Sequence, residues 1–230
     1  MTFFRIVPEL AERYRVVMPD LRNHGHSDWI RGKYEVAELA DEVAGVLDAL
    51  GVRAATVMGY SLGGMVAQEL TRRHPHLVGQ LVLGGTAARP VPALRGLARV
   101  GFWLGRAAAR ISTREGALIT TTVLRRTGAL GRDHERWMYE ALLRRDADLF
   151  YEAGFAAVRF DSRDWIGKLG VPITVVIPSH DVLVPASAQR DLARRIPDAR
   201  VVELPGTGHE AVLTRSDDIV KVLHEVMAAT

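Results

Sequence analysis

The sequence predicts an α/β protein, with a mostly parallel sheet covered by helices on both faces and one helical insertion. Short apolar runs rich in β-branched residues alternate with amphipathic helical patterns over residues 14–84 and again over 171–227. These runs are almost continuously apolar, which is typical of parallel strands buried on both faces. Between the two regions, residues 88–160 show helical patterns and no strand pattern.

The N-terminal region begins with a helix pattern and a strand pattern. Residues 3–13 are predicted to form a short helix, and residues 14–18 a strand. An amphipathic helix is predicted over 35–50, where Gly51 fits the C′ position that favours left-handed backbone. A second strand is predicted over 55–58.

A strand predicted over 80–84 precedes the insertion. After the insertion, the C-terminal region resumes the alternation of strands and helices. Strands are expected over 171–177 and 199–204, and helices over 186–196 and 216–227.

The insertion is rich in arginine and is predicted to be helical throughout. One helix over 97–111 places two groups of residues on different faces: Leu97, Val100, Trp103, Leu104, Ala108 and Ile111 on one, Arg99, Arg106 and Arg110 on the other. Two more helices are expected over 133–145 and 147–160. We therefore divide the chain into residues 1–87 and 161–230, which form one core, and residues 88–160, which form a helical cap (lid).

Composition limits the possible classes of protein. With 230 residues, 48% of them hydrophobic, the chain can bury one large core. A net charge of +3 does not indicate a nucleic-acid partner, and the absence of cysteine excludes disulfides, thiolate nucleophiles and cysteine-based zinc sites. No apolar run approaches the roughly 18–20 residues of a membrane span, and the N-terminus lacks a signal-peptide layout. We expect a cytoplasmic protein without stable membrane insertion.

The strand predicted over 55–58 leads into Gly59-Tyr60-Ser61-Leu62-Gly63-Gly64, and a helical pattern follows. This context predicts a sharp strand-to-helix turn with Ser61 at its tip and with positive φ. Gly59 and Gly63 are the positions where strand and helix are expected to pass too closely for a side chain. The alternative is a flexible turn that happens to contain a serine.

A serine hydroxyl needs a base to take its proton, and the base needs a carboxylate to orient it. His209 follows the strand predicted over 199–204, and Asp181 follows the strand predicted over 171–177. The carboxyl ends of parallel strands share one edge of a sheet, so both residues are expected beside Ser61. Taken separately, Asp181 could instead cap a helix and His209 could be a surface histidine. Glu210 is expected to point away from His209.

Two further histidines, His24 and His26, share the loop NHGHSD. A metal site is possible there, but a third ligand at useful spacing is missing. We therefore expect a structural turn that lines one side of a pocket, and no metal.

With these residues in place, the chain resembles the α/β-hydrolase superfamily, and within it the single-domain serine esterases, lactonases and thioesterases. The matching motifs are PDLRNHGHSD, GYSLGGMVAQEL, LVLGGTA, VPITVVIPSHDVLVP and LPGTGHE. The resemblance implies hydrolysis through an acyl-enzyme without a cofactor. Ser61 would attack a carbonyl, His209 would act as base and then acid, and Asp181 would orient the imidazole. The backbone N–H of Leu62 would stabilise the oxyanion.

Other functions fit the same resemblance. An acyltransferase or perhydrolase would use the same three residues, and a non-catalytic or impaired relative would only bind a ligand.

The chain departs from this family at its start. The resemblance implies a strand and a His-Gly-type loop before the first helix, and this loop supplies a second oxyanion donor. No such pattern precedes Phe3. The start could be assigned too late, the two flanking strands could close on each other, or the chain could be a decayed relative. We expect the first explanation, and an oxyanion hole with one donor would lower turnover roughly 100- to 1,000-fold.

The substrate is the least specified feature. An apolar pocket under the cap is expected from Tyr60, Met65, Trp103 and Leu183, and it would favour a small-molecule acyl substrate. These side chains could equally belong to the core. The arginines of the cap could attract an acidic substrate or an anionic surface, but acidic residues are interspersed among them, which favours a solvated helical face.

Overall fold

The computed structural model describes residues 3–30, 32, 34–89, 92–126, 130–143 and 147–229. Within this part a parallel sheet of four strands has the order β1-β2-β3-β4. The strands are β1 (Ala55–Tyr60), β2 (Val78–Gly84), β3 (Ile173–Pro178) and β4 (Arg200–Leu204). The four strands predicted from residue 55 onward are therefore confirmed.

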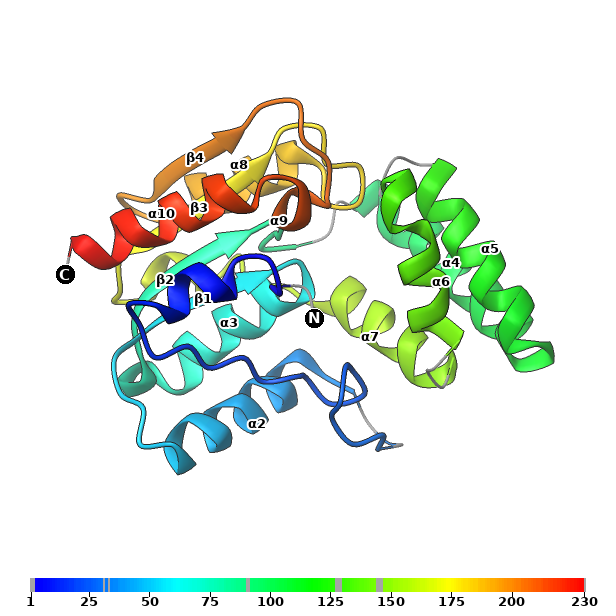
Figure 1. Cartoon of the computed structure of the whole chain (residues 1–230), viewed down its shortest axis with the longest axis horizontal. Helices are drawn as coiled ribbons and strands as arrows, with labels where there is room; N and C mark the ends of the chain where they lie inside the picture. Colours follow the sequence, from blue (N-terminus) through cyan, green and yellow to red (C-terminus); the bar gives the residue numbers. More distant parts are fainter. Residues whose placement is uncertain are drawn as a thin grey trace.

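Helices cover both faces of the sheet, as predicted (Figure 1). One face packs against α2 (Val36–Ala49), α3 (Leu62–Arg73) and α8 (Ala186–Arg194), and the other against α1 (Val7–Ala11) and α10 (Ser216–Ala228). The short helix α9 (Ala211–Thr214) precedes α10, and single turns of 3-10 helix lie at Pro75–Leu77 (η1), Arg132–His134 (η2) and Ile166–Lys168 (η3).

The two cores follow the alternation of side chains along the strands. Leu83 and Val175 are paired across β2 and β3 and belong to the core beneath α2 and α3. Val82 and Val176 point to the opposite face and belong to the core beneath α10. Both middle strands are thus buried on both faces, which explains their continuously apolar sequence.

The C-terminus of α2 confirms the predicted role of Gly51. This glycine has φ +65°, its N–H donates to the Asp48 carbonyl at 3.0 Å, and the Val52 N–H donates to the Leu47 carbonyl at 2.9 Å. The two bonds form a Schellman cap, which satisfies carbonyls that the helix itself leaves unpaired.

The prediction of a strand over residues 14–18 is wrong. These residues have no regular secondary structure, and no backbone hydrogen bond joins residues 14–20 to β1 in the described part of the chain. Val16 and Val17 still pack against the two different cores. A β-branched run becomes a strand only where a partner strand supplies hydrogen bonds, and no described residue does so here. The two flanking segments have therefore not closed on each other.

Between β2 and β3, the described residues form four α-helices: α4 (Pro92–Ile111), α5 (Thr113–Arg126), α6 (Glu135–Leu143) and α7 (Ala147–Arg159). They pack on one another beside the end of the sheet toward which the strands point (Figure 1). The sequence patterns located α4, α6 and α7, but α5 was not predicted as a separate helix. No helix in the described ranges is both long and apolar enough to cross a membrane.

Candidate active site

Ser61 occupies the sharp turn between β1 and α3. Its backbone has φ 54° and ψ −120°, a strained combination for a residue with a side chain. A Cβ atom on Gly59 would lie 2.4 Å from the Gly63 carbonyl oxygen and 2.7 Å from the Gly64 Cα. Gly59 therefore allows strand and helix to approach each other, as the sequence predicts.

At Gly63, the predicted close approach of strand and helix is wrong. A Cβ atom at that position would meet nothing within 4 Å, whereas one on Gly64 would lie 2.6 Å from the Thr86 side chain. The tight contact on the helix side thus falls one residue later, where α3 packs against the segment that follows β2.

His209 and Asp181 lie beside Ser61 and form a chain of hydrogen bonds with it. The His209 Nε2 is 3.0 Å from the Ser61 Oγ, and the His209 Nδ1 is 2.8 Å from the Asp181 Oδ2. The Asp181 side chain is completely buried and that of His209 is 14% exposed. The structure thus brings together the three residues that were selected from the sequence.

Four donors surround the Asp181 carboxylate. Its Oδ1 accepts the backbone N–H groups of Leu183 and Val184, each at 2.9 Å. Its Oδ2 accepts the Gln189 Nε2 at 3.1 Å, in addition to His209. Gln189 lies on α8 and is fully buried. The sequence carries no signal for this contact, because it depends on how α8 packs beside the loop.

The loops that carry Asp181 and His209 are joined directly. The Ser179 N–H donates to the Leu204 carbonyl at 3.1 Å, and the His180 N–H donates to the Thr207 carbonyl at 2.8 Å. The Gly206 N–H donates to the Ser179 hydroxyl at 2.9 Å. These bonds extend the pairing of β3 with β4 beyond the strand ends, so the two loops hold a fixed relative position.

Tyr60 contacts both the backbone and the ring of His209. The Tyr60 hydroxyl donates to the His209 backbone carbonyl at 2.8 Å, and the two rings lie 5.6 Å apart. Burial raises the pKa of the Tyr60 phenol, and the nearby carboxylates of Asp181 and Glu210 raise it further. The hydroxyl therefore remains a proton donor at neutral pH.

Comparison with known proteins now identifies the fold family. A family model described as alpha/beta hydrolase fold matches residues 2–216. The chain belongs to the α/β hydrolases. This α/β hydrolase is 31% identical over 236 residues to a pimeloyl-[acyl-carrier protein] methyl ester esterase of Chromobacterium violaceum, a match that covers 97% of this chain and 87% of the esterase. It is also 29% identical over 222 residues to a poly(3-hydroxyalkanoate) depolymerase of Ectopseudomonas oleovorans, covering 96% of this chain and 77% of the depolymerase.

Solved structures agree with this assignment. An enol-lactonase from Burkholderia xenovorans LB400 superimposes with a TM-score of 0.81 and 25% identity, over 99% of this chain and 86% of the lactonase. A thermophilic esterase from Thermogutta terrifontis shares the fold with a TM-score of 0.83 and 24% identity, over 99% of this chain and 85% of the esterase. The α/β hydrolase described here is thus a hydrolytic enzyme by family.

The structure places the four residues predicted to line a pocket in different surroundings. Tyr60 and Met65 are buried in different cores. Trp103 on α4 is 64% exposed, and Leu183, beside Asp181, is 45% exposed. Of these, Tyr60 and Leu183 contact the Ser61–His209–Asp181 chain, through the hydrogen bonds described above. A pocket formed by all four remains a prediction.

The NHGHSD loop forms a turn, as expected. Gly25 has φ +54°, and a Cβ atom there would lie 2.2 Å from the Asp20 carboxyl, which accepts the His26 N–H at 2.9 Å. Among the residues that the structure describes, no three histidine or acidic side chains are grouped so as to hold a metal ion.

Glu210 is the carboxylate nearest to His209 in sequence. A Cβ atom on Gly131, in the helical insertion, would lie 3.4 Å from the Glu210 Oε1. The Glu210 side chain makes no hydrogen bond to the His209 ring, whose Nδ1 contacts Asp181. Glu210 therefore points away from the His209 ring, as predicted, and it lies beside Gly131 of the helical insertion.

Proposed function

We propose that this α/β hydrolase cleaves a carboxylic ester, or a related lactone or thioester, through an acyl-enzyme formed on Ser61. The observation that carries the proposal is the continuous chain of hydrogen bonds from Asp181 through His209 to the Ser61 hydroxyl. In this chain, Ser61, His209 and Asp181 occupy the positions of a nucleophile, a general base and an orienting carboxylate. The names of the relatives, which include a methyl ester esterase and an enol-lactonase, support the same class of reaction.

In the first half of the reaction, the Ser61 Oγ attacks the carbonyl carbon of the substrate while the His209 Nε2 takes the hydroxyl proton. Asp181 stabilises the imidazolium that forms, and its buried carboxylate keeps the ring in the orientation that exposes Nε2 to Ser61. When the tetrahedral intermediate collapses, His209 returns the proton to the leaving alcohol or thiol. In the second half, the His209 Nε2 takes a proton from a water molecule, whose oxygen attacks the acyl carbon. The bond from this carbon to the Ser61 Oγ then breaks, His209 returns the proton to the Oγ, and the acid is released.

The oxyanion is assigned to the N-terminus of α3. Leu62 is the first residue of this helix, so its N–H has no acceptor within the helix. The helix dipole also favours negative charge at this end. We propose the Leu62 N–H as one oxyanion donor.

We further propose that residues 88–160 form a cap over the site. The helices α4–α7 lie at the side of the sheet where β3 and β4 end and where Asp181 and His209 follow them (Figure 1). A small-molecule acyl substrate would then bind between these helices and the strand ends.

A fluorophosphonate probe tests the proposal, because it labels a serine only when a base activates it. We expect labelling of the wild-type chain and hydrolysis of at least one member of a panel of p-nitrophenyl esters, lactones and thioesters. Ser61→Ala should abolish labelling, and Ser61→Ala or His209→Ala should lower kcat by about 10⁴-fold or more. Ser216→Ala, which changes a half-buried serine at the start of α10, is the matched control. A folded wild-type chain that is neither labelled nor active would contradict the proposal and favour a binding protein.

A further inference from the structure

Two consecutive residues contact the histidine of the candidate site. The Ser61 hydroxyl lies 3.0 Å from the Nε2 of the His209 ring, and the Tyr60 hydroxyl donates to the His209 backbone carbonyl at 2.8 Å. Tyr60 is the last residue of β1, and it is only 7% exposed. The strand that leads into Ser61 therefore also holds the main chain of His209.

The end of β2 fixes the position of the Tyr60 ring. Tyr60 is paired with Gly84 across β1 and β2. A Cβ atom on Gly84 would lie 2.7 Å from the Tyr60 Cδ2, and one on Gly85 would lie 2.8 Å from the Cζ. Any side chain at either position would overlap with the ring, and Gly85 also has φ +52°, which favours glycine. The double glycine of the LVLGGTA motif thus forms a cradle for this ring.

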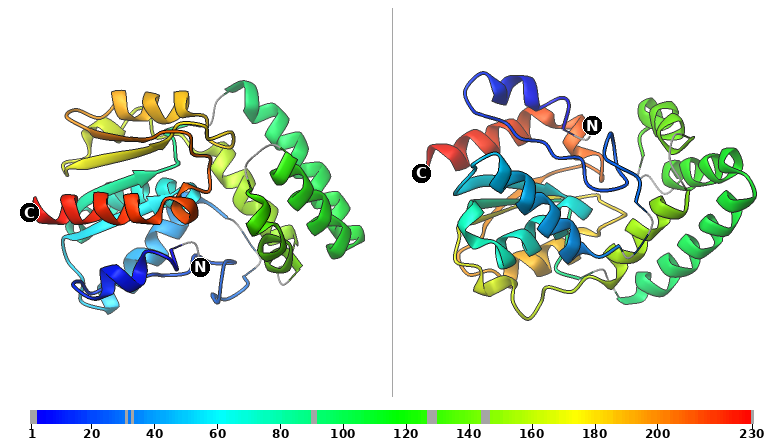
Figure 2. Two further views of the ribbon diagram at one scale, coloured as in Figure 1. Left: turned by 45° about the horizontal axis from the view of Figure 1, so that its top comes forward. Right: turned by 90° about the horizontal axis from the view of Figure 1, so that it is seen from below.

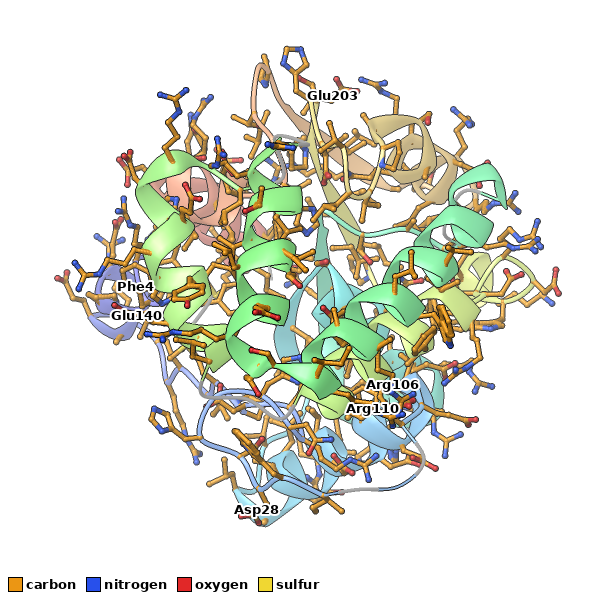
Figure 3. All side chains as sticks on the ribbon, turned by 90° about the vertical axis from the view of Figure 1, so that its right-hand side faces the viewer. Phe4, Asp28, Arg106, Arg110, Glu140 and Glu203 are labelled. Carbon is orange, nitrogen blue, oxygen red and sulfur yellow. The ribbon has the colours of Figure 1, made fainter. Side chains whose placement is uncertain are left out.

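The loop that carries His209 is held to two different strands. The hydrogen bonds described above join it to the residues that follow β3, beside Asp181. The Tyr60 hydroxyl joins it to the end of β1, beside Ser61. In the left-hand view of Figure 2, the chain between β4 and α9 runs past the ends of the other strands. Figure 3, seen from the side of the insertion, labels Glu203 of β4 and shows the helices of the insertion in front of the strand ends.

We propose that Tyr60 is a positioning residue for the reaction at Ser61. Its hydroxyl fixes the His209 backbone relative to the nucleophile, so that Nε2 stays within hydrogen-bonding distance of the Oγ while it takes and returns the proton. Such precision matters, because a displacement of about 1 Å can cost about a hundredfold in rate. The inference rests on the proposed function, and it gives Tyr60 a role other than lining a substrate pocket.

Tyr60→Phe tests this role, because it keeps the ring in its cradle and removes only the hydroxyl. We expect kcat on the best p-nitrophenyl ester to fall by about five- to fiftyfold, with KM changed by less than about twofold. The rate of fluorophosphonate labelling should fall by a similar factor, since labelling needs the same proton transfer from Ser61 to His209. In a pH profile of this rate, the plateau should fall and the midpoint should stay in place, because the base itself is unchanged.

The matched control is Tyr14→Phe, which changes a second tyrosine–histidine contact. The Tyr14 hydroxyl lies 3.4 Å from the Nδ1 of His224 on α10, and the two rings are 5.7 Å apart, compared with 5.6 Å for Tyr60 and His209. This variant should keep the wild-type kcat, KM and labelling rate. Both variants keep the apolar contacts of their rings, so both should fold, and circular dichroism and urea unfolding measure fold and stability.

A purely structural role for the Tyr60 hydroxyl would lower the free energy of unfolding and leave kcat and the labelling rate unchanged, and this result overturns the inference. A higher KM at unchanged kcat, or a shifted midpoint at an unchanged plateau, also overturns it, because Tyr60 would then contact substrate or alter the basicity of His209. In each of these cases the wild-type chain is active, so the proposed function stands. A wild-type chain that is neither labelled nor active overturns both.

Discussion

The surroundings of Asp181 show how Gln189, a side chain outside the sequence motifs, contributes to the candidate site. The carboxylate has no exposure to water and is surrounded by four donors, two from the backbone and two from the side chains of His209 and Gln189. Gln189 is the side-chain donor that takes no part in the proposed proton transfer. Gln189 also donates to the Val184 carbonyl at 2.7 Å, so it holds both the carboxylate and the loop that carries it. Hydrogen bonds to charged groups are worth about 1.5–3 kcal/mol.

Gln189→Leu should lower kcat/KM by roughly ten- to a hundredfold, since Asp181 keeps two backbone donors and His209. The loss should fall on kcat, because Gln189 orients Asp181 and makes no contact with Ser61. Steady-state kinetics on the best p-nitrophenyl ester measures this. Ser187→Ala, at an exposed position of the same helix, is the control. A kcat equal to that of the wild type would show that the backbone donors alone position Asp181.

At the scale of single residues, the sequence predicts those features of the candidate site that local patterns determine. Ser61 lies in a glycine-bracketed turn, and Asp181 and His209 each follow a strand, so their convergence follows from parallel topology. The supporting contacts of Gln189 and Tyr60 are not predictable in this way. Gln189 reaches Asp181 through the packing of α8, and Tyr60 reaches His209 across 149 positions of sequence.

At the scale of elements, the turn between β1 and α3 separates two glycines that look equivalent in the sequence. Gly59→Ala should destabilise the protein by about 1–3 kcal/mol or prevent folding, because the new Cβ atom meets backbone atoms that cannot move aside. Gly63→Ala should be neutral or stabilise by about 0.5–1 kcal/mol, since the position is helical and open. Urea unfolding of the two variants measures the difference. Equal losses in both would contradict the packing described here.

The ion pair that joins α2 to α3 predicts a dependence of stability on pH. Hydrogen bonds from Arg73, and then from His74, lower the pKa of Asp41 from its ordinary value of 3.8 to about 2. Because the pKa is lower in the folded state, the stabilising effect is fully present above pH 3.8 and is lost as the pH falls toward 2.

Asp41→Asn should therefore lower the free energy of unfolding at neutral pH, by about 1 kcal/mol or less because the pair is partly exposed. The difference between wild type and variant should shrink between pH 4 and pH 2. Urea unfolding at a series of pH values checks this. A difference that stays constant down to pH 2 would assign the effect to something other than the carboxylate charge.

The elements also show where sequence patterns fail. Buried strands were predicted well because apolar runs are a local signal. The end of α2 was predicted because Gly51 alone indicates a helix cap. Residues 14–18 have the composition of a strand, but strand formation requires a partner, and composition cannot reveal whether one is within reach. The patterns likewise missed α5, which is separated from α4 only by Ser112.

At the scale of the whole molecule, a buried polar cluster joins the two ends of the helical insertion to the core. The Ser162 N–H donates to the Ala88 carbonyl at 2.8 Å, which brings together residues on either side of α4–α7. The Ser162 hydroxyl donates to the Gln68 Oε1 on α3 at 2.6 Å. Gln68 and Ser162 are both fully buried. The helix that begins beside Ser61 is thus tied directly to the base of the insertion.

Ser162→Ala should destabilise the protein by about 1–3 kcal/mol, because it leaves a buried amide oxygen on Gln68 without a donor. Gln68→Leu alone should also be costly, since the Ser162 hydroxyl loses its shorter hydrogen bond and keeps only the Ala88 carbonyl, at 3.3 Å, as acceptor. The double variant should be less destabilised than the sum of the two, because replacing both partners removes the unsatisfied groups. Urea unfolding of the four proteins in this cycle gives the coupling energy. Strictly additive losses would mean that the two side chains stabilise the junction independently, and that its rigidity comes from the backbone bond between Ser162 and Ala88.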